Sequence, residues 1–230
     1  EKMIISSIRN PWDWYVSLWA YGCSSRGRIY LDAMRSKLGG VLHVLKMAKS
    51  NSVIRRNTHM HLIDELRRQP SLWAERYGNT NDPDAFRSWL KAIMSGDKTA
   101  LSQFGYSRLE ISETVGLYTF RAARMAIKES AWNSAILHIN NPEKLNIFWE
   151  ENNLIQRYIR VEHLEDDLSE ILNDLGNNVT SDDLKAIKTN SSSHLHFSEY
   201  YDRETRELVE LRDQLVIQKF GYSAPTLRSN

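Results

Sequence analysis

The chain has 230 residues, with 30 basic and 29 acidic side chains, a net charge of +1 and a single cysteine, Cys23. This length suits one domain, or one domain with a helical annex. The balanced charge argues against a nucleic-acid binder held by bulk electrostatics, and a lone cysteine excludes an intramolecular disulfide. No apolar run approaches about 18 residues and no signal-peptide layout is present, so we expect a cytoplasmic protein without membrane or nucleic-acid partners.

The first expected elements are a strand and a helix. Residues 2–8 are short, β-branched and apolar, which indicates a buried strand. Asn10 suits a helix N-cap and Pro11 suits the first helical position, where a missing N–H costs nothing. We therefore predict a helix from Pro11 to about Tyr21.

The middle of the chain is mostly helical in pattern. Residues 29–69 are weakly periodic and suggest short helices joined by connections. Asn79 to Pro83 marks a helix start. Residues 111–135 have the pattern of one long, largely buried helix, and residues 143–151 that of a short one.

The C-terminal part adds a second strand. Residues 155–161 form a strand candidate that leads into an amphipathic helix closed by Gly176. Residues 182–188 suit two helical turns, and residues 202–220 predict a single strong helix. Strands alternating with helices favour an α/β fold with a parallel sheet, here dominated by helix.

Arg9 and Ser17 are the first candidate site residues. At about 100° per residue, Ser17 lies within about 20° of the helix face on which the chain enters at Asn10. Free N–H groups at a helix N-terminus attract anions, and a guanidinium and a hydroxyl on one side suit a phosphate monoester. The alternative interpretation is structural, with Arg9 paired to a carboxylate and the neighbouring aromatic residues in the core.

Three segments, in order, resemble PAPS-dependent sulfotransferases, which use 3′-phosphoadenosine 5′-phosphosulfate (PAPS) as donor. They are Arg9-Asn10-Pro11-Trp12 with Ser17; Ile159-Arg160-Val161-Glu162-His163-Leu164 with Asp166-Asp167-Leu168 and Leu175-Gly176; and His196 to Asp202 with Glu204 to Val209, Arg212-Asp213 and Phe220-Gly221-Tyr222. The resemblance covers about a quarter of the chain. It implies a P-loop-like three-layer fold over residues 1–230 as one domain, with about residues 25–150 as a variable helical region on the acceptor side.

The resemblance also implies roles for individual residues. Arg9 and Ser17 would bind the 3′-phosphate of the nucleotide. Ser192 and His194 are the nearest equivalents of a C-terminal phosphate-binding loop, whose basic family form is absent here. Val161 stands where some members place a tyrosine against the adenine, so the chain departs from the family at that contact.

The family's Gly-rich loop for the 5′-phosphosulfate and its catalytic base precede the Arg-x-Pro segment. No Gly-x-x-Gly-x-[Ser/Thr] pattern occurs in this sequence, so we expect both upstream of residue 1 and no turnover by this chain alone. The resemblance implies a small-molecule or carbohydrate acceptor bearing a hydroxyl or amine, and no metal.

Other patterns leave alternatives open. His59-Met60-His61 and His194-Leu195-His196 would share a face on a strand and could bind zinc, although solvated histidines are the default. Arg121 and Arg124 are unusual in the predicted long helix, and they either pair with acids in the core or face the donor. Glu162 is expected to orient Arg9 or Arg160 as a structural group. A second functional hypothesis is a non-catalytic helical interaction module with a residual nucleotide-phosphate pocket.

Overall fold

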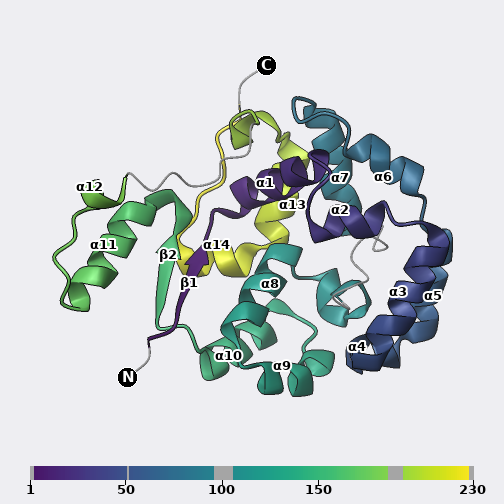
Figure 1. The fold of residues 1–230 in the computed structure, drawn as a ribbon, viewed down its shortest axis with the longest axis horizontal. Helices are drawn as coiled ribbons and strands as arrows, with labels where there is room; N and C mark the ends of the chain where they lie inside the picture. Colours follow the sequence, from purple (N-terminus) through teal and green to yellow (C-terminus); the bar gives the residue numbers. More distant parts are fainter. Residues whose placement is uncertain (1–2, 51, 96–105, 186–193, 228–230) are drawn as a thin grey trace.

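A parallel pair of short strands joins two distant parts of the sequence. In the computed structural model, which describes residues 3–50, 52–95, 106–185 and 194–227, β1 (Ile5–Ile8) pairs with β2 (Arg157–Arg160). The register places Ile5 opposite Arg157 and Ile8 opposite Arg160. Both strands lie inside the predicted segments, and their parallel pairing within a helix-dominated chain confirms the coarse α/β prediction (Figure 1). The three-layer P-loop arrangement stays a prediction.

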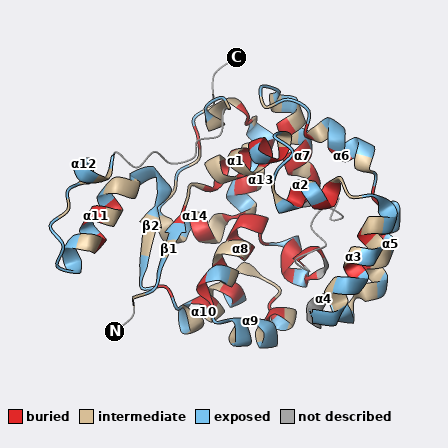
Figure 2. Cartoon of the chain, in the orientation of Figure 1, coloured by how far each residue is buried: buried red, intermediate tan, exposed pale blue. Residues whose placement is uncertain are grey.

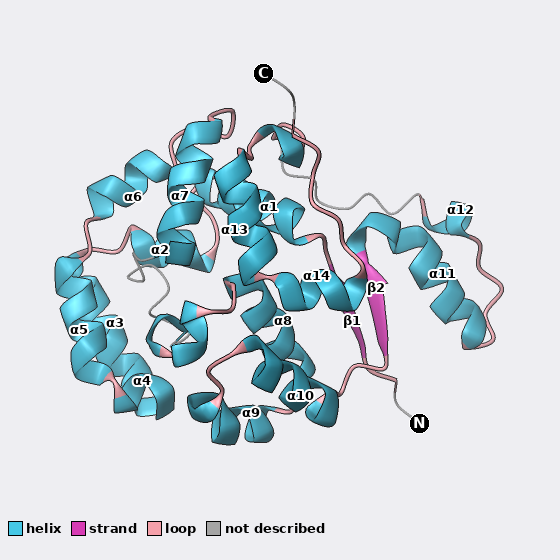
Figure 3. Cartoon of the chain, turned by 180° about the vertical axis from the view of Figure 1, so that it is seen from behind, coloured by secondary structure: helices cyan, strands magenta, loops and turns pink. Residues whose placement is uncertain are grey.

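Helices make up most of the remaining structure (Figure 3). The α-helices are α1 (Pro11–Cys23), α2 (Arg28–Ala33), α3 (Lys37–Ser50), α4 (Ser52–Arg56), α5 (Thr58–Arg67), α6 (Pro70–Arg76), α7 (Pro83–Ser95), α8 (Leu117–Ala126), α9 (Glu129–Ala135), α10 (Pro142–Asn152), α11 (Leu164–Asp174), α12 (Ser181–Leu184), α13 (Arg203–Arg212) and α14 (Gln214–Phe220). Short 3₁₀ turns cover Tyr106–Arg108, Glu110–Glu113, Ile136–His138, Val161–His163 and Phe197–Glu199. The predicted turns at 182–188 correspond to α12 as far as residue 185, and 186–188 lie outside the described residues.

Helix α1 is at the centre of the core. Its side chains Trp12, Tyr15 and Trp19 are fully buried, and they pack among residues of α7, α8 and α13. Both indole N–H groups of these side chains have partners: Trp12 Nε1 donates to the carbonyl of Arg206 and Trp19 Nε1 to that of Arg76. Figure 2 shows the buried residues gathered on α1, α8 and the inward faces of their neighbours, whereas α11 and α12 extend away beyond the strands.

The prediction of one continuous helix over residues 111–135 is wrong, because the structure divides this segment. A 3₁₀ turn covers Glu110–Glu113, α8 ends at Ala126, and α9 begins at Glu129. Ile127 is extended (ψ 140°) and forms an antiparallel bridge with Asn153, before β2. Pairing with a distant segment therefore interrupts a helix that local periodicity favours.

The predicted single helix over residues 202–220 is also divided, at Asp213. Asp213 has ψ 19° and is completely buried. Its Oδ1 accepts the N–H of Thr119 in the first turn of α8, and its Oδ2 accepts the Tyr15 hydroxyl of α1, both at 2.8 Å. The carboxylate thus caps the N-terminus of another helix, where free N–H groups and the helix dipole favour negative charge.

Gly116 allows this contact, since a Cβ at its position would overlap the Asp213 carboxylate. The Gly116 N–H also donates to the carbonyl of Arg212, at 2.6 Å. The approach of α13 to the start of α8 therefore requires a residue without a side chain.

None of the helices in the described part of the chain is both long and apolar enough to span a lipid bilayer.

The buried Asp213 makes stability depend on pH. Burial raises the pKa of its carboxyl to about 6, despite the opposing hydrogen bonds from Thr119 and Tyr15. Between about pH 4 and 6 the folded chain holds a proton that the unfolded chain has lost, so this group's stabilising contribution falls as pH rises through that window. We predict that the unfolding free energy of wild type minus that of Asp213→Asn falls by about 2.4 kcal/mol between pH 4 and 7. Urea unfolding across this range measures the difference.

Asp183→Asn is a matched control of opposite sign. Hydrogen bonds from Thr180 lower the pKa of Asp183 in the folded chain. The unfolding free energy of wild type minus that of Asp183→Asn should rise with pH below about pH 5 and stay constant from pH 5 to 7. A pH-independent difference for Asp213→Asn would contradict the role assigned to its burial.

Candidate anion site

Arg9 directly follows β1, and hydrogen bonds to its backbone hold it in place. The Tyr118 hydroxyl of α8 accepts the Arg9 N–H and donates to the Arg9 carbonyl, each at 2.8 Å. Ile8, just before it, is buried in the core. These contacts fix the point at which the chain leaves the sheet, so the Arg9 side chain starts from a rigid position.

The N–H groups at the start of α1 are already engaged, which corrects the expectation that they are free to hold an anion. The Asn10 side chain accepts the N–H groups of Trp12 (3.0 Å) and Asp13 (3.4 Å), so Asn10 is the predicted N-cap. Glu162 Oε1 accepts the Asn10 N–H at 2.5 Å. An anion beside Arg9 is therefore left to side-chain donors.

Glu162 pairs with neither Arg9 nor Arg160, so the expectation that it orients one of them is wrong. Its carboxylate contacts the Asn10 N–H and, at 3.5 Å, the Tyr222 hydroxyl. Arg160 instead pairs with Asp167, its Nη2 lying 2.6 Å from Oδ1. Glu162 thus joins the end of β2 to the start of α1.

The Arg9 guanidinium is partly exposed and ion-paired. Its Nε lies 2.6 Å from Asp13 Oδ2, one helical turn further on, and the side chain is 29% exposed. No hydrogen bond from Arg9 Nη1 or Nη2 to another described residue is present. The paired nitrogens that suit a phosphate thus retain donors, while Asp13 reduces the local positive charge.

Ser17 and Arg9 line the same hollow, which we call the arginine pocket. Its volume is about 360 Å³, within the usual range for small-ligand pockets. The Ser17 Oγ is shielded from solvent and has no hydrogen-bond partner among the described residues. The pocket is lined by Arg9, Trp14, Ser17, Leu18, Tyr21, Gly27, Arg28, Ile29 and Arg121.

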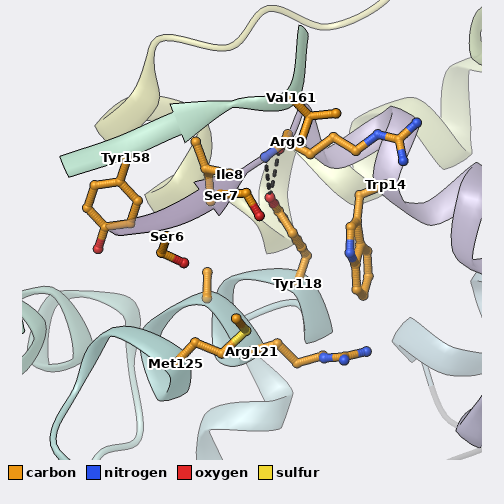
Figure 4. A pocket seen from close by; sticks show the side chains of 11 residues that line it. Ser6, Ser7, Ile8, Arg9, Trp14, Tyr118, Arg121, Met125, Tyr158 and Val161 are labelled. Atoms are coloured by element: carbon orange, nitrogen blue, oxygen red, sulfur yellow. Dashed lines mark hydrogen bonds between the residues drawn. The ribbon is translucent and has the colours of Figure 1, made fainter. Parts of the chain in front are cut away.

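Two further arginines in this pocket come from other elements. Arg28 begins α2, where its Nε lies 3.3 Å from Asp32 Oδ2 and its Nη2 lies 3.1 Å from His43 Nε2. Arg121 comes from α8 and lies over the Trp14 ring, with Cζ 5.5 Å from the centroid. Figure 4 shows Trp14 between the Arg9 and Arg121 side chains. The sequence marks Arg121 as unusual in its helix, but it contains no signal that joins Arg28 to Arg9.

The charges in the arginine pocket are of one sign. Three guanidinium groups line it and no acidic side chain does. Burial lowers the pKa of Arg121, with a further contribution from Arg124, but an arginine stays charged at neutral pH. Burial also raises the pKa of Asp32 behind Arg28, against the opposing effect of Arg35. The pocket therefore favours an anionic ligand.

A second hollow adjoins the first along β1. It shares Arg9, Trp14 and Arg121 with the arginine pocket, and Figure 4 shows the side chains that surround it. Its other lining residues are Ser6, Ser7, Ile8, Tyr118, Ala122, Met125, Tyr158 and Val161. A ligand that extends past Trp14 meets aromatic faces and two serine residues here.

The structure tests one of the two other predicted phosphate contacts, His194. His194 is not among the residues that line either hollow, and its Nδ1 lies 2.6 Å from the carbonyl oxygen of Leu195. Ser192 lies outside the described residues. Their roles toward a nucleotide stay predictions.

The histidine pairs are not on strands. His59 and His61 lie on α5, where side chains two positions apart point to different faces. His196 is the N-cap of the 3₁₀ turn at Phe197–Glu199, with its Nδ1 2.8 Å from the Ser198 hydroxyl. Among the described residues, no three His, Cys, Asp or Glu side chains are grouped to hold a metal ion.

Comparisons with known proteins do not assign the chain to a family. No family model matches it, and neither the curated proteins nor the solved structures gave a significant match.

The unpartnered Ser17 hydroxyl predicts a measurable effect on stability. In Ser17→Ala a buried, unsatisfied oxygen is removed from a helix and replaced by the best helix former, so the free energy of unfolding should rise by about 0.5–1 kcal/mol. Urea unfolding without ligand tests this. Ser134→Ala, at an exposed hydroxyl of α9 that donates to the Ala131 carbonyl, is the contrasting control, because it makes the same change in helix propensity but removes a hydroxyl that has a partner. Destabilisation at Ser17 would indicate that its hydroxyl serves the fold.

Proposed function

We propose that the chain binds the ribose 3′-phosphate of PAPS and functions in transferring its sulfuryl group to a hydroxyl or amine acceptor. The observation that carries the proposal is that Arg9 and Ser17 line one pocket, with Arg28 and Arg121 beside them. The parallel strands that precede Arg9 and Glu162 add support, because the resembling segments lie together at the ends of β1 and β2. The P-loop-like sulfotransferase fold belongs to the same proposal.

The residues present suit a phosphate monoester. A guanidinium offers paired N–H groups to phosphate oxygens, and charge-assisted hydrogen bonds of this kind are stronger than neutral ones. Ser17 Oγ needs a partner, and a rotation about its χ1 angle would offer its hydroxyl to a bound phosphate. Arg28 and Arg121 add positive charge to the same pocket.

When bound, the donor would supply the activated sulfuryl group. The proposed task of Arg9, Ser17 and Arg28 is to hold the ribose phosphate and thereby orient the nucleotide. Trp14 and the adjoining aromatic hollow offer a face on which the base can stack. We assign no residue of this chain as catalytic base or to the 5′-phosphosulfate.

Nucleotide binding gives the direct test. Titration calorimetry should show tighter binding of adenosine 3′,5′-bisphosphate than of adenosine 5′-monophosphate, because only the former has the 3′-phosphate. Arg9→Ala should weaken bisphosphate binding by at least about tenfold while leaving the monophosphate nearly unchanged. Arg203→Ala, at a side chain 84% exposed on α13, is the matched control and should have no effect.

Equal affinity for the two nucleotides, or an Arg9→Ala variant that binds like wild type, would refute the phosphate assignment. Transfer from labelled PAPS then separates an enzyme from a non-catalytic module. A protein that binds the bisphosphate but supports no transfer, including when any natural flanking sequence is present, would favour the module.

A further inference from the structure

Helix α3 exposes leucines on the side away from the core. Leu38, Leu42 and Leu45 are 70%, 59% and 44% exposed. At 100° per residue these three side chains lie within about 60° of one another on the helix. The buried residues of α3, Gly40 and Val44, lie on the opposite side. A surface helix normally turns its apolar stripe inward, so this arrangement is reversed.

The contact between α3 and α5 explains the reversal. The two helices are neighbours, and a Cβ at Gly40 would overlap Glu65 Oε2 of α5. Arg68 Nη2 pairs with Glu65 Oε2 at 2.8 Å, and its Nη1 donates to the Ala33 carbonyl. A glycine and a buried ion pair thus fill the interface, and the leucines are left outside.

The same region carries only one sign of fixed charge. Between Asp32 and Asp64 the sequence has no acidic residue, but it contains six basic ones, namely Arg35, Lys37, Lys46, Lys49, Arg55 and Arg56. Arg35 pairs with Asp32. In the described part of the chain, the other five form no ion pair. Lys46 and Lys49 lie on the same outward side of α3 as the leucines.

Leucines flanked by lysines suit one kind of partner. We propose that the outward face of α3, formed by Leu38, Leu42, Leu45, Lys46 and Lys49, binds the surface of a lipid membrane that contains anionic phospholipids. The leucines enter the boundary between headgroups and acyl chains, and the lysines contact the lipid phosphates. The earlier expectation of no membrane partner came from the lack of a spanning segment, which does not bear on a helix that lies on the surface.

Charge disfavours a second copy of the chain on this face. If two copies met through this face, their lysines would lie close together, and their like charges would repel most strongly at low ionic strength. The apolar centre also differs from a nucleic-acid-binding face, which is polar and contacts phosphates chiefly through basic side chains. An anionic bilayer offers an apolar environment to the leucines and negative charge to the lysines.

Vesicle flotation with the whole chain tests the proposal. The protein should float with vesicles of phosphatidylcholine containing one third phosphatidylserine, and much less with pure phosphatidylcholine. Lys46→Glu/Lys49→Glu should lower the apparent affinity at least about tenfold, and Leu38→Ser/Leu42→Ser should do so as well. Raising the salt should weaken wild-type binding, because exposed charges are screened.

Matched controls lie on other faces. Lys128→Glu/Lys144→Glu makes the same change in net charge at exposed positions outside α3, and Leu211→Ser removes a leucine that is 64% exposed on α13. Both variants should bind vesicles like wild type. Circular dichroism and thermal unfolding identify any variant whose loss reflects misfolding.

Three results would overturn the proposal. The first is equal binding to neutral and anionic vesicles. The second is unchanged binding by the folded leucine variant, which would leave only general electrostatic attraction. The third is a dimer that forms without lipid and dissociates in Leu42→Ser, which would make this face a contact between copies.

Discussion

The buried carboxylate of Asp213 joins the elements that carry the candidate site. Helix α8 begins without local capping side chains, so its first N–H groups take partners from elsewhere: Asp213 accepts from Thr119, and the Tyr15 hydroxyl accepts from Tyr118. Since Tyr15 belongs to α1 and also donates to Asp213, one small network sets α1 against α8. Helix α1 carries Trp14 and Ser17, and Arg9 lies just before it. Helix α8 carries Arg121. The shape of the arginine pocket therefore follows from this network.

Local sequence patterns predicted the fold where short-range chemistry decides it. The β-branched segments became β1 and β2, Asn10 and Pro11 started α1, and helical periodicity placed Arg9 and Ser17 beside one pocket. The patterns failed at Ile127 and Asp213, where a distant strand connection and a distant helix N-terminus interrupt regular helices. Arg28 was missed because only the tertiary arrangement brings the start of α2 to this pocket.

The two candidate surfaces recognise negative charge by different means. In the arginine pocket, arginines from three separate segments line a concave space, which suits a compact ligand. On α3, lysines surround leucines on a convex helix, which suits an extended interface. The Arg28–His43 contact lies between them, since Arg28 lines the pocket and His43 belongs to α3. A ligand that draws Arg28 inward would have to break or lengthen this contact.

The distribution of the tryptophans has a practical consequence. Of the seven indoles, Trp14 alone is partly exposed and the other six are buried. Trp14 also lies between Arg9 and Arg121, whose positive charges attract small anions. Iodide should therefore quench its emission selectively, and a bound ligand should protect it. The chain thus contains an intrinsic optical reporter at the arginine pocket, against a background of indoles that solutes do not reach.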